Sequence, residues 1–220
     1  EIFYSLDENT GLNFNGSLSS RHNSFSYDES IFAFRKEERD LSFLPSADKK
    51  FFPYYEVFGE IEHYFSESNY MKAAAGYRSK VFYDEFFGGK NNHEITSLVI
   101  PLQLNNTISD FYSYEAEIQG ERVYDNFNRG QEVFYNLLFT FINTVKSSLT
   151  LTLRYELTDN NHDLSGKKNW FTIEAGYRIN QGNSAVISYG SERGGQICSN
   201  GVCRYIQPFE GFRVSLLSNF

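Results

Sequence analysis

Apolar and polar residues alternate along much of the chain, and the final segment shows this pattern clearly. In an extended strand, successive side chains point to opposite sides. In residues 209–220 the side chains of Phe212, Val214, Leu216 and Phe220 would therefore share one apolar face, which in a membrane would contact lipid. Residues 149–157 alternate without exception between apolar odd positions and polar even positions. Both segments are typical of strands with one apolar face.

Comparable stretches, separated by turn-like residues, recur along the chain and predict about twelve strands. The expected strands are residues 1–6, 12–25, 31–43, 54–65, 70–83, 94–104, 111–122, 131–145, 149–157, 171–179, 185–193 and 209–220. A tilted strand that spans a bilayer needs about 9–11 residues, and residues 1–6 are too few. We therefore expect residues 1–220 to be a single domain that forms the C-terminal part of a longer chain. The alternative is that residues 1–6 are a tail.

The connections between the expected strands alternate in length. The short ones are residues 26–30, 66–69, 105–109, 146–148 and 181–183, and the longer ones are residues 44–53, 85–93, 123–130, 159–169 and 194–208. Outer-membrane barrels have short periplasmic turns and long external loops, whereas a soluble β-sandwich has no reason to alternate so regularly. The sequence therefore predicts an all-β, antiparallel, up-and-down transmembrane β-barrel, either complete or part of a larger barrel.

Composition narrows the class of protein further. Aromatic residues make up 18% of the chain, yet no apolar run reaches the roughly 18 residues of a spanning helix, which excludes a helical membrane protein. Aromatic residues such as Tyr64, Phe111 and Trp170 gather towards strand ends, where the interfacial girdles of barrels lie. The net charge of −8 argues against binding to nucleic acid.

If the apolar face points outward, charged residues collect on the inward face. The expected lumen charges are Glu56, Glu60, Glu62, Lys72, Arg78, Lys80, Glu115, Glu117, Glu121, Arg154, Glu156, Glu174 and Arg178. A register that keeps both faces consistent across the turn at residues 66–69 sets Glu62 opposite Lys72 and Glu56 opposite Arg78. Such charges can line a wet channel or lock together as a polar plug, and the sequence leaves both open.

The chain has two cysteines, Cys198 and Cys203, on either side of Asn200-Gly201. Asn-Gly is a strong signal for a two-residue hairpin turn, so we expect the cysteines to lie side by side and to form a disulfide. A disulfide persists in oxidising places such as the periplasm or the cell exterior. The alternative is two free thiols in a cytosolic loop.

The sequence suggests neither catalysis nor a bound metal or cofactor. No catalytic motif surrounds any of the four histidines, His22, His63, His93 and His162. Residues 159–163 offer oxygen ligands but lack the spacing of a calcium loop. We therefore expect that the protein is not an enzyme, and an embedded hydrolase is the least supported interpretation.

The C-terminal stretch, residues 187–220, combines several short motifs. They are Tyr189-Gly190, Arg193-Gly194-Gly195, Cys198 to Cys203-Arg204, Pro208, Gly211-Phe212 and the terminal Phe220. In these motifs the chain resembles an uncharacterised Bacteroidetes-type family of outer-membrane β-barrels. The resemblance implies the outer membrane of a Gram-negative bacterium, a lipid bilayer around the barrel, and outer-membrane or periplasmic proteins as candidate partners, but no particular activity.

Two functions fit these expectations. The first is a porin-like channel that passes small solutes through a charge-lined lumen. The alternative is a structural or docking subunit of an outer-membrane assembly, with the lumen occluded.

Overall fold

The computed structural model describes residues 1–20, 23–41, 54–82, 93–128, 130–146, 148–163, 166–199 and 202–218. This part of the chain forms strands and turns, and it contains no helix that could cross a membrane. Eleven of its strands make one antiparallel sheet. They are β1 (Ile2–Ser5), β2 (Thr10–Ser19), β5 (Tyr54–Ser66), β6 (Asn69–Phe82), β7 (His93–Ser109), β8 (Tyr112–Asp125), β9 (Val133–Val145), β10 (Leu149–Thr158), β11 (Asn169–Arg178), β12 (Asn183–Glu192) and β15 (Phe209–Ser218).

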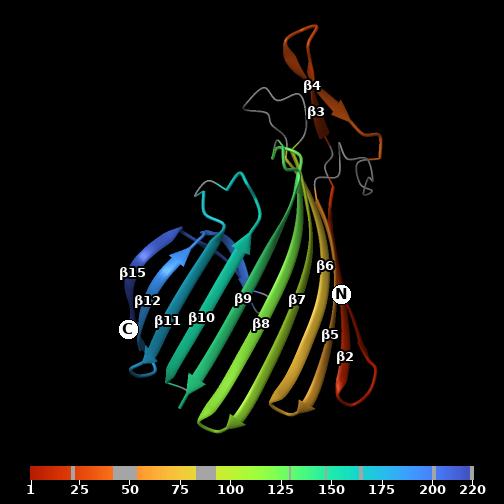
Figure 1. Cartoon of the computed structure of the whole chain (residues 1–220). Helices are drawn as coiled ribbons and strands as arrows, with labels where there is room; N and C mark the ends of the chain where they lie inside the picture. The colour runs from red at the N-terminus through yellow and green to blue at the C-terminus, as the bar shows by residue number, and fades with distance from the viewer. Residues whose placement is uncertain are drawn as a thin grey trace.

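The strands follow one another across the sheet in chain order, and two hairpins lie outside it. β3 (Asn23–Asp28) pairs with β4 (Ala33–Glu38), and β13 (Gly195–Ser199) pairs with β14 (Val202–Ile206). The sheet is strongly curved, and its edge strands β1 and β15 do not pair with each other (Figure 1). The predicted all-β, antiparallel, up-and-down order is confirmed, and the sheet is open at its two edges.

The main difference from the sequence prediction lies in residues 12–43. The alternating pattern predicts two spanning strands there, joined by a short turn at residues 26–30, but β2 ends at Ser19 and pairs directly with β5. β3 and β4 instead form a hairpin beyond the upper end of the sheet in Figure 1. Alternation places side chains on the two faces of a strand, but it does not specify the partner strand. This is why the prediction of two spanning strands is wrong here.

The two ends of the sheet nevertheless differ as predicted. The connections at the lower end in Figure 1 are residues 6–9, 67–68, 110–111, 146–148 and 179–182. At the upper end in Figure 1, successive strand ends are separated in the sequence by residues 20–53, 83–92, 126–132, 159–168 and 193–208. The asymmetry of short and long connections therefore holds, with residues 6–9 in place of residues 26–30.

Asp7 builds the short turn between β1 and β2. Its carboxylate accepts hydrogen bonds from the backbone N–H of Asn9 at 2.8 Å and from the hydroxyl of Thr10 at 3.0 Å. These bonds, the one from Asn9 first, hold the pKa of Asp7 below its usual value. The turn explains why residues 1–6 fold back onto β2 as a short edge strand.

The register gives the sheet one polar and one apolar face. Residues directly opposite each other on neighbouring antiparallel strands share a face. Glu56 lies opposite Arg78 and Arg78 lies opposite Ser97, and this face is the concave one. The other face is convex and carries Val57 opposite Tyr77.

Apolar side chains on the convex face are exposed. They include Val57, Ile61, Leu98, Ile100, Leu102, Ile118, Leu137, Phe139, Leu151, Leu153, Phe171, Ile173, Ile187, Phe212, Val214 and Leu216. Contacts between the described strands are confined to sheet neighbours and to the two separate hairpins, so no second layer of this part of the chain covers them. The predicted apolar face of the last strand is present at residues 212, 214 and 216, and Phe220 lies outside the described residues.

Gly190 allows β12 to pass close to β11. Its φ is +134°, and a Cβ at this position would lie 2.0 Å from the carbonyl oxygen of Phe171. Gly211, which lies opposite Gly190 on β15, also has a positive φ of +114°. Only glycine adopts such a conformation readily. Both glycines of the C-terminal motif therefore have a structural role, because their positive φ angles suit glycine and Gly190 also allows the close approach to β11.

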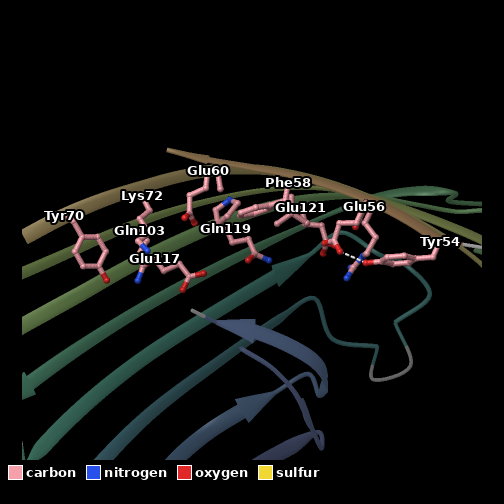
Figure 2. Close-up of a pocket in the computed structure, with 16 residues that line it drawn as sticks. Tyr54, Glu56, Phe58, Glu60, Tyr70, Lys72, Gln103, Glu117, Gln119 and Glu121 are labelled. Carbon is pink, nitrogen blue, oxygen red and sulfur yellow. Dashed lines mark hydrogen bonds between the residues drawn. The ribbon is translucent and has the colours of Figure 1, made fainter. Parts of the chain in front are cut away.

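The β13–β14 hairpin turns inward over the concave side of the sheet (Figures 1 and 2). Its base is tight, because a Cβ on Gly194 would lie only 2.6 Å from the backbone nitrogen of Pro208. Cys198 lies opposite Cys203 in the strand register, as the sequence predicts. The turn residues Asn200 and Gly201 and the cysteine side chains lie outside the described part of the structure, and the disulfide stays a prediction.

Candidate functional site: the concave polar face

The concave face is hollowed where β5, β6, β7 and β8 run side by side (Figure 2). The hollow has a volume of about 810 Å³. Small residues on β6 leave this room, because Ala74 and Gly76 stand between Lys72 and Arg78 on the concave face. Gly76 also lets the Phe58 ring lie close, since a Cβ there would be 3.1 Å from Cδ2 of Phe58.

Residues of opposite charge are register partners at two places along the hollow. Lys72 Nζ lies 3.0 Å from Oε1 of Glu62, which is its partner in the strand register. Glu56 lies opposite Arg78 in the register and accepts a hydrogen bond from the Tyr54 hydroxyl. The register predicted from the sequence is therefore confirmed at both pairs.

Two further glutamates line the hollow between these pairs. Glu60 lies opposite Asn13 on β2, and Glu117 lies opposite Gln103 on β7. Neither Glu60 nor Glu117 is in an ion pair with another residue of the described part of the chain. The hollow thus carries more negative than positive charge.

The other predicted lumen charges lie on the same concave face but outside the hollow. Glu174 accepts a hydrogen bond from the Ser188 hydroxyl at 3.0 Å, and Arg154 Nη2 lies 3.8 Å from Oε2 of Glu156. The register places three more predicted charges on this face, namely Lys80, Glu115 and Arg178. The predicted charges are thus divided between those that line the hollow and those outside it, and several of the latter lie in a more crowded region on β9–β12.

Arg193 organises the crowded region. Its Nε donates to Oδ2 of Asp163 at 2.7 Å, and its Nη1 donates to Oε1 of Glu156 at 3.3 Å and to Oδ1 of Asn136 at 3.1 Å. The guanidinium also lies over the Trp170 ring, 5.3 Å from its centroid. We call these five residues the Arg193 cluster. It ties the loop that contains Asp163 to the ends of four strands.

The Arg193 cluster extends to the edge of the hollow. Asn136 accepts a hydrogen bond from the Thr158 hydroxyl at 2.7 Å and donates one to Oε2 of Glu121 at 2.9 Å. Glu121 itself lines the hollow. Trp170 is only 3% exposed, so its predicted place in an interfacial girdle is wrong. The ring is buried on the polar face because Arg193 covers it.

The Arg193 cluster is not predicted from the sequence. Arg193 is identified from the sequence only as part of a motif, and Asp163 only as part of a polar loop. One feature of the sequence could have indicated the cluster. The single tryptophan, Trp170, is a large aromatic residue at a position where the alternation of its strand predicts a polar side chain. A buried aromatic ring there needs a partner with an extended apolar or cationic surface.

Two of the described histidines, His63 and His93, contact neighbouring side chains and lie on different strands. His63 Nδ1 lies 2.9 Å from Oγ1 of Thr10, and His93 Nε2 lies 2.8 Å from Oδ1 of Asp125. Phe127 packs beside His93, with the ring centroids 4.4 Å apart. Among the residues that the structure describes, no group of three or more His, Cys, Asp or Glu side chains is placed to hold a metal ion.

Comparison with known families covers the entire sequence. A model described as a family of unknown function, DUF6029, matches residues 1–220. The chain belongs to the DUF6029 family. No curated protein matches it. The prediction of an uncharacterised family is confirmed, while a Bacteroidetes origin and the cysteine motif of this DUF6029 member stay predictions.

Proposed function

We propose that this DUF6029 protein lies in the outer membrane of a Gram-negative bacterium and forms the wall of a β-barrel channel for small solutes. Its convex apolar face contacts lipid, and its concave polar face lines a water-filled lumen. Further strands pair with the free edges of β1 and β15 and close the barrel.

The exposed apolar face is the observation that carries this proposal. Soluble proteins rarely expose a contiguous apolar patch larger than a few hundred Å². Here exposed apolar side chains continue across neighbouring strands; Tyr155, for example, lies between Phe139 and Phe171, and all three are exposed. Lipid tails would cover this face, which the described part of the chain leaves uncovered.

Strand length and backbone chemistry support the same proposal. β10, β11, β12 and β15 each have 10 residues, within the range of about 9–11 for a tilted spanning strand. Lipid cannot hydrogen-bond the N–H and C=O groups of an open edge, so only a closed sheet is stable in the hydrocarbon layer. The free edges of β1 and β15 therefore require further strands if the sheet lies in a membrane.

Conductance tests the channel. The intact protein, purified from membranes and inserted into planar lipid bilayers, should produce discrete steps of ionic current, because the concave face is polar and hollow. A mock preparation from cells that lack the protein is the control. Folded protein that inserts but never conducts would contradict the channel.

The inward β13–β14 hairpin favours the second candidate, an occluded lumen in a docking subunit. Gly194 and Pro208 are in contact at its base, so residues 195–207 can be replaced by a short glycine linker. If the hairpin occludes the lumen, this replacement should raise the conductance several-fold above that of the unmodified protein. Equal conductance of the two proteins would argue against occlusion by the hairpin. A docking subunit should also co-purify with a partner from solubilised membranes.

A further inference from the structure

The hollow between β5 and β8 offers recognition groups for one class of solute. We propose that it binds small organic cations, which carry ammonium or guanidinium groups, and that it makes the channel selective for them. This inference rests on the proposed channel and names the solute that the same face admits.

Charge is the first reason. Four glutamates line the hollow, Glu56, Glu60, Glu117 and Glu121, against Lys72 and Arg78. Both cations lie opposite a glutamate in the strand register, and Lys72 is ion-paired. Glu60 and Glu117 have no ion-pair partner in the described part of the chain. A positively charged solute therefore meets two carboxylates that are not in an ion pair with a described protein cation.

Aromatic rings also line the hollow, and they favour an organic cation over a metal ion. Tyr54, Phe58 and Tyr70 line the hollow (Figure 2). The face of an aromatic ring attracts an ammonium or guanidinium group within about 6 Å of its centroid. Lys72 Nζ lies 5.2 Å from the centroid of Tyr70, so this ring already accepts a cation. Carboxylates combined with rings suit an organic cation, whereas hard metal ions take oxygen ligands alone.

Buried oxygen atoms without partners are the second, independent observation. Ser97 lines the hollow and is 4% exposed, and its Oγ has no hydrogen-bond partner in the described structure. Oδ1 of Asn13, which lies opposite Glu60, is also buried and without a partner there. Buried polar groups are nearly always hydrogen-bonded. Both oxygens can accept hydrogen bonds, and the N–H groups of an organic cation can donate them.

Calorimetric titration of the intact protein in detergent micelles tests the proposal. Putrescine is the probe, and succinate, which has the same four-carbon chain and opposite charge, is the control ligand. We expect putrescine to bind and succinate not to bind. Succinate binding at least as tight as putrescine binding would overturn the proposal, and this comparison needs no variant.

Variants locate the binding site. We expect Glu60→Gln and Glu117→Gln each to weaken putrescine binding about fivefold, because each removes one nearby negative charge. Ser97→Ala keeps every charge and should weaken it about threefold, because one hydrogen bond is lost. Glu174→Gln removes a carboxylate from the same face outside the hollow and should leave binding unchanged. Equal weakening by Glu174→Gln, or no effect of the three variants in the hollow, would contradict a site in the hollow.

Two readouts separate this inference from the channel proposal. Putrescine binding without ionic current would leave the binding site in place and contradict the channel. Current without putrescine binding, and with no preference for cations in the reversal potential, would retain the channel and contradict the cation site.

Discussion

Replacing Leu153 by arginine is expected to lower the free energy of unfolding in lipid bilayers by about 2–4 kcal/mol. Leu153 lies midway along β10, on the apolar face and 38% exposed, between Phe141 and Ile173. If this face contacts acyl chains, a guanidinium at this depth has no water and no counter-ion near it. Urea titration of vesicle-embedded protein measures the effect, and the fluorescence of the single tryptophan, Trp170, reports unfolding because the ring is buried.

Two variants on the same strand serve as matched controls. Leu149→Arg places the charge at the lower end of β10, where the cost in a barrel falls to about 0–1 kcal/mol near the interface. Thr152→Arg places it on the concave face, opposite Glu174 in the register, and should cost little. A sheet whose convex face met water would tolerate Leu153→Arg as well as Thr152→Arg. Equal stability of these two variants would therefore contradict the membrane proposal.

Sequence pattern was sufficient for the features that depend on alternation and short turns. β10 follows the predicted segment to within one residue, because its odd positions are all apolar and its even positions all polar. The pairing of Glu62 with Lys72 was predictable because the short turn leaves one register that keeps both faces consistent. The bulge between Tyr64 and Ser66 was not predictable from the sequence. It shifts the register next to the turn, but residues 54–64 keep the same faces and the same register, so the alternating pattern does not reveal it.

Features that depend on the choice of a distant partner were not predictable. β2 skips the hairpin of β3 and β4 and pairs with β5, and local alternation is the same for either partner. The Arg193 cluster joins a strand end to a loop residue 30 positions away, and no period in the sequence marks such a contact. Closure of the proposed barrel would belong to the same class, because it would require partners for β1 and β15 that the pattern does not specify.

The two halves of the concave face differ in how their polar side chains are arranged. Between β5 and β8, small residues on β6 leave a hollow with an excess of carboxylates. Between β9 and β12, the Arg193 guanidinium donates hydrogen bonds to Asp163, Asn136 and Glu156 and occupies the space between their side chains. We infer that the first region meets the solute and that the second stiffens the wall and holds the upper loop in place.

Replacing Arg193 by alanine is the sharpest test of that second role, and we expect it to lower the free energy of unfolding by about 2–4 kcal/mol. The loss removes the guanidinium from the carboxylates of Asp163 and Glu156, whose side chains are 11% and 17% exposed, and leaves Glu156 the longer contact with Arg154 at 3.8 Å. It also removes the cation above Trp170. Removing one partner of a fully buried ion pair costs about 3–5 kcal/mol, and partial exposure reduces this value.

A graded set of variants distinguishes the cluster from a single surface charge. Arg193→Lys keeps the charge but not the planar fork that reaches Asp163, Glu156 and Asn136 together, so it should recover less than half of the lost stability. Arg35→Ala breaks an exposed pair with Asp28 at 3.1 Å and should cost less than about 1 kcal/mol. Because the Arg193 guanidinium binds two carboxylates and one amide, the effects of Arg193→Ala and Asp163→Asn should not add in the double variant. Additive effects would mean that Arg193 and Asp163 act independently, and the upper loop would then need another anchor.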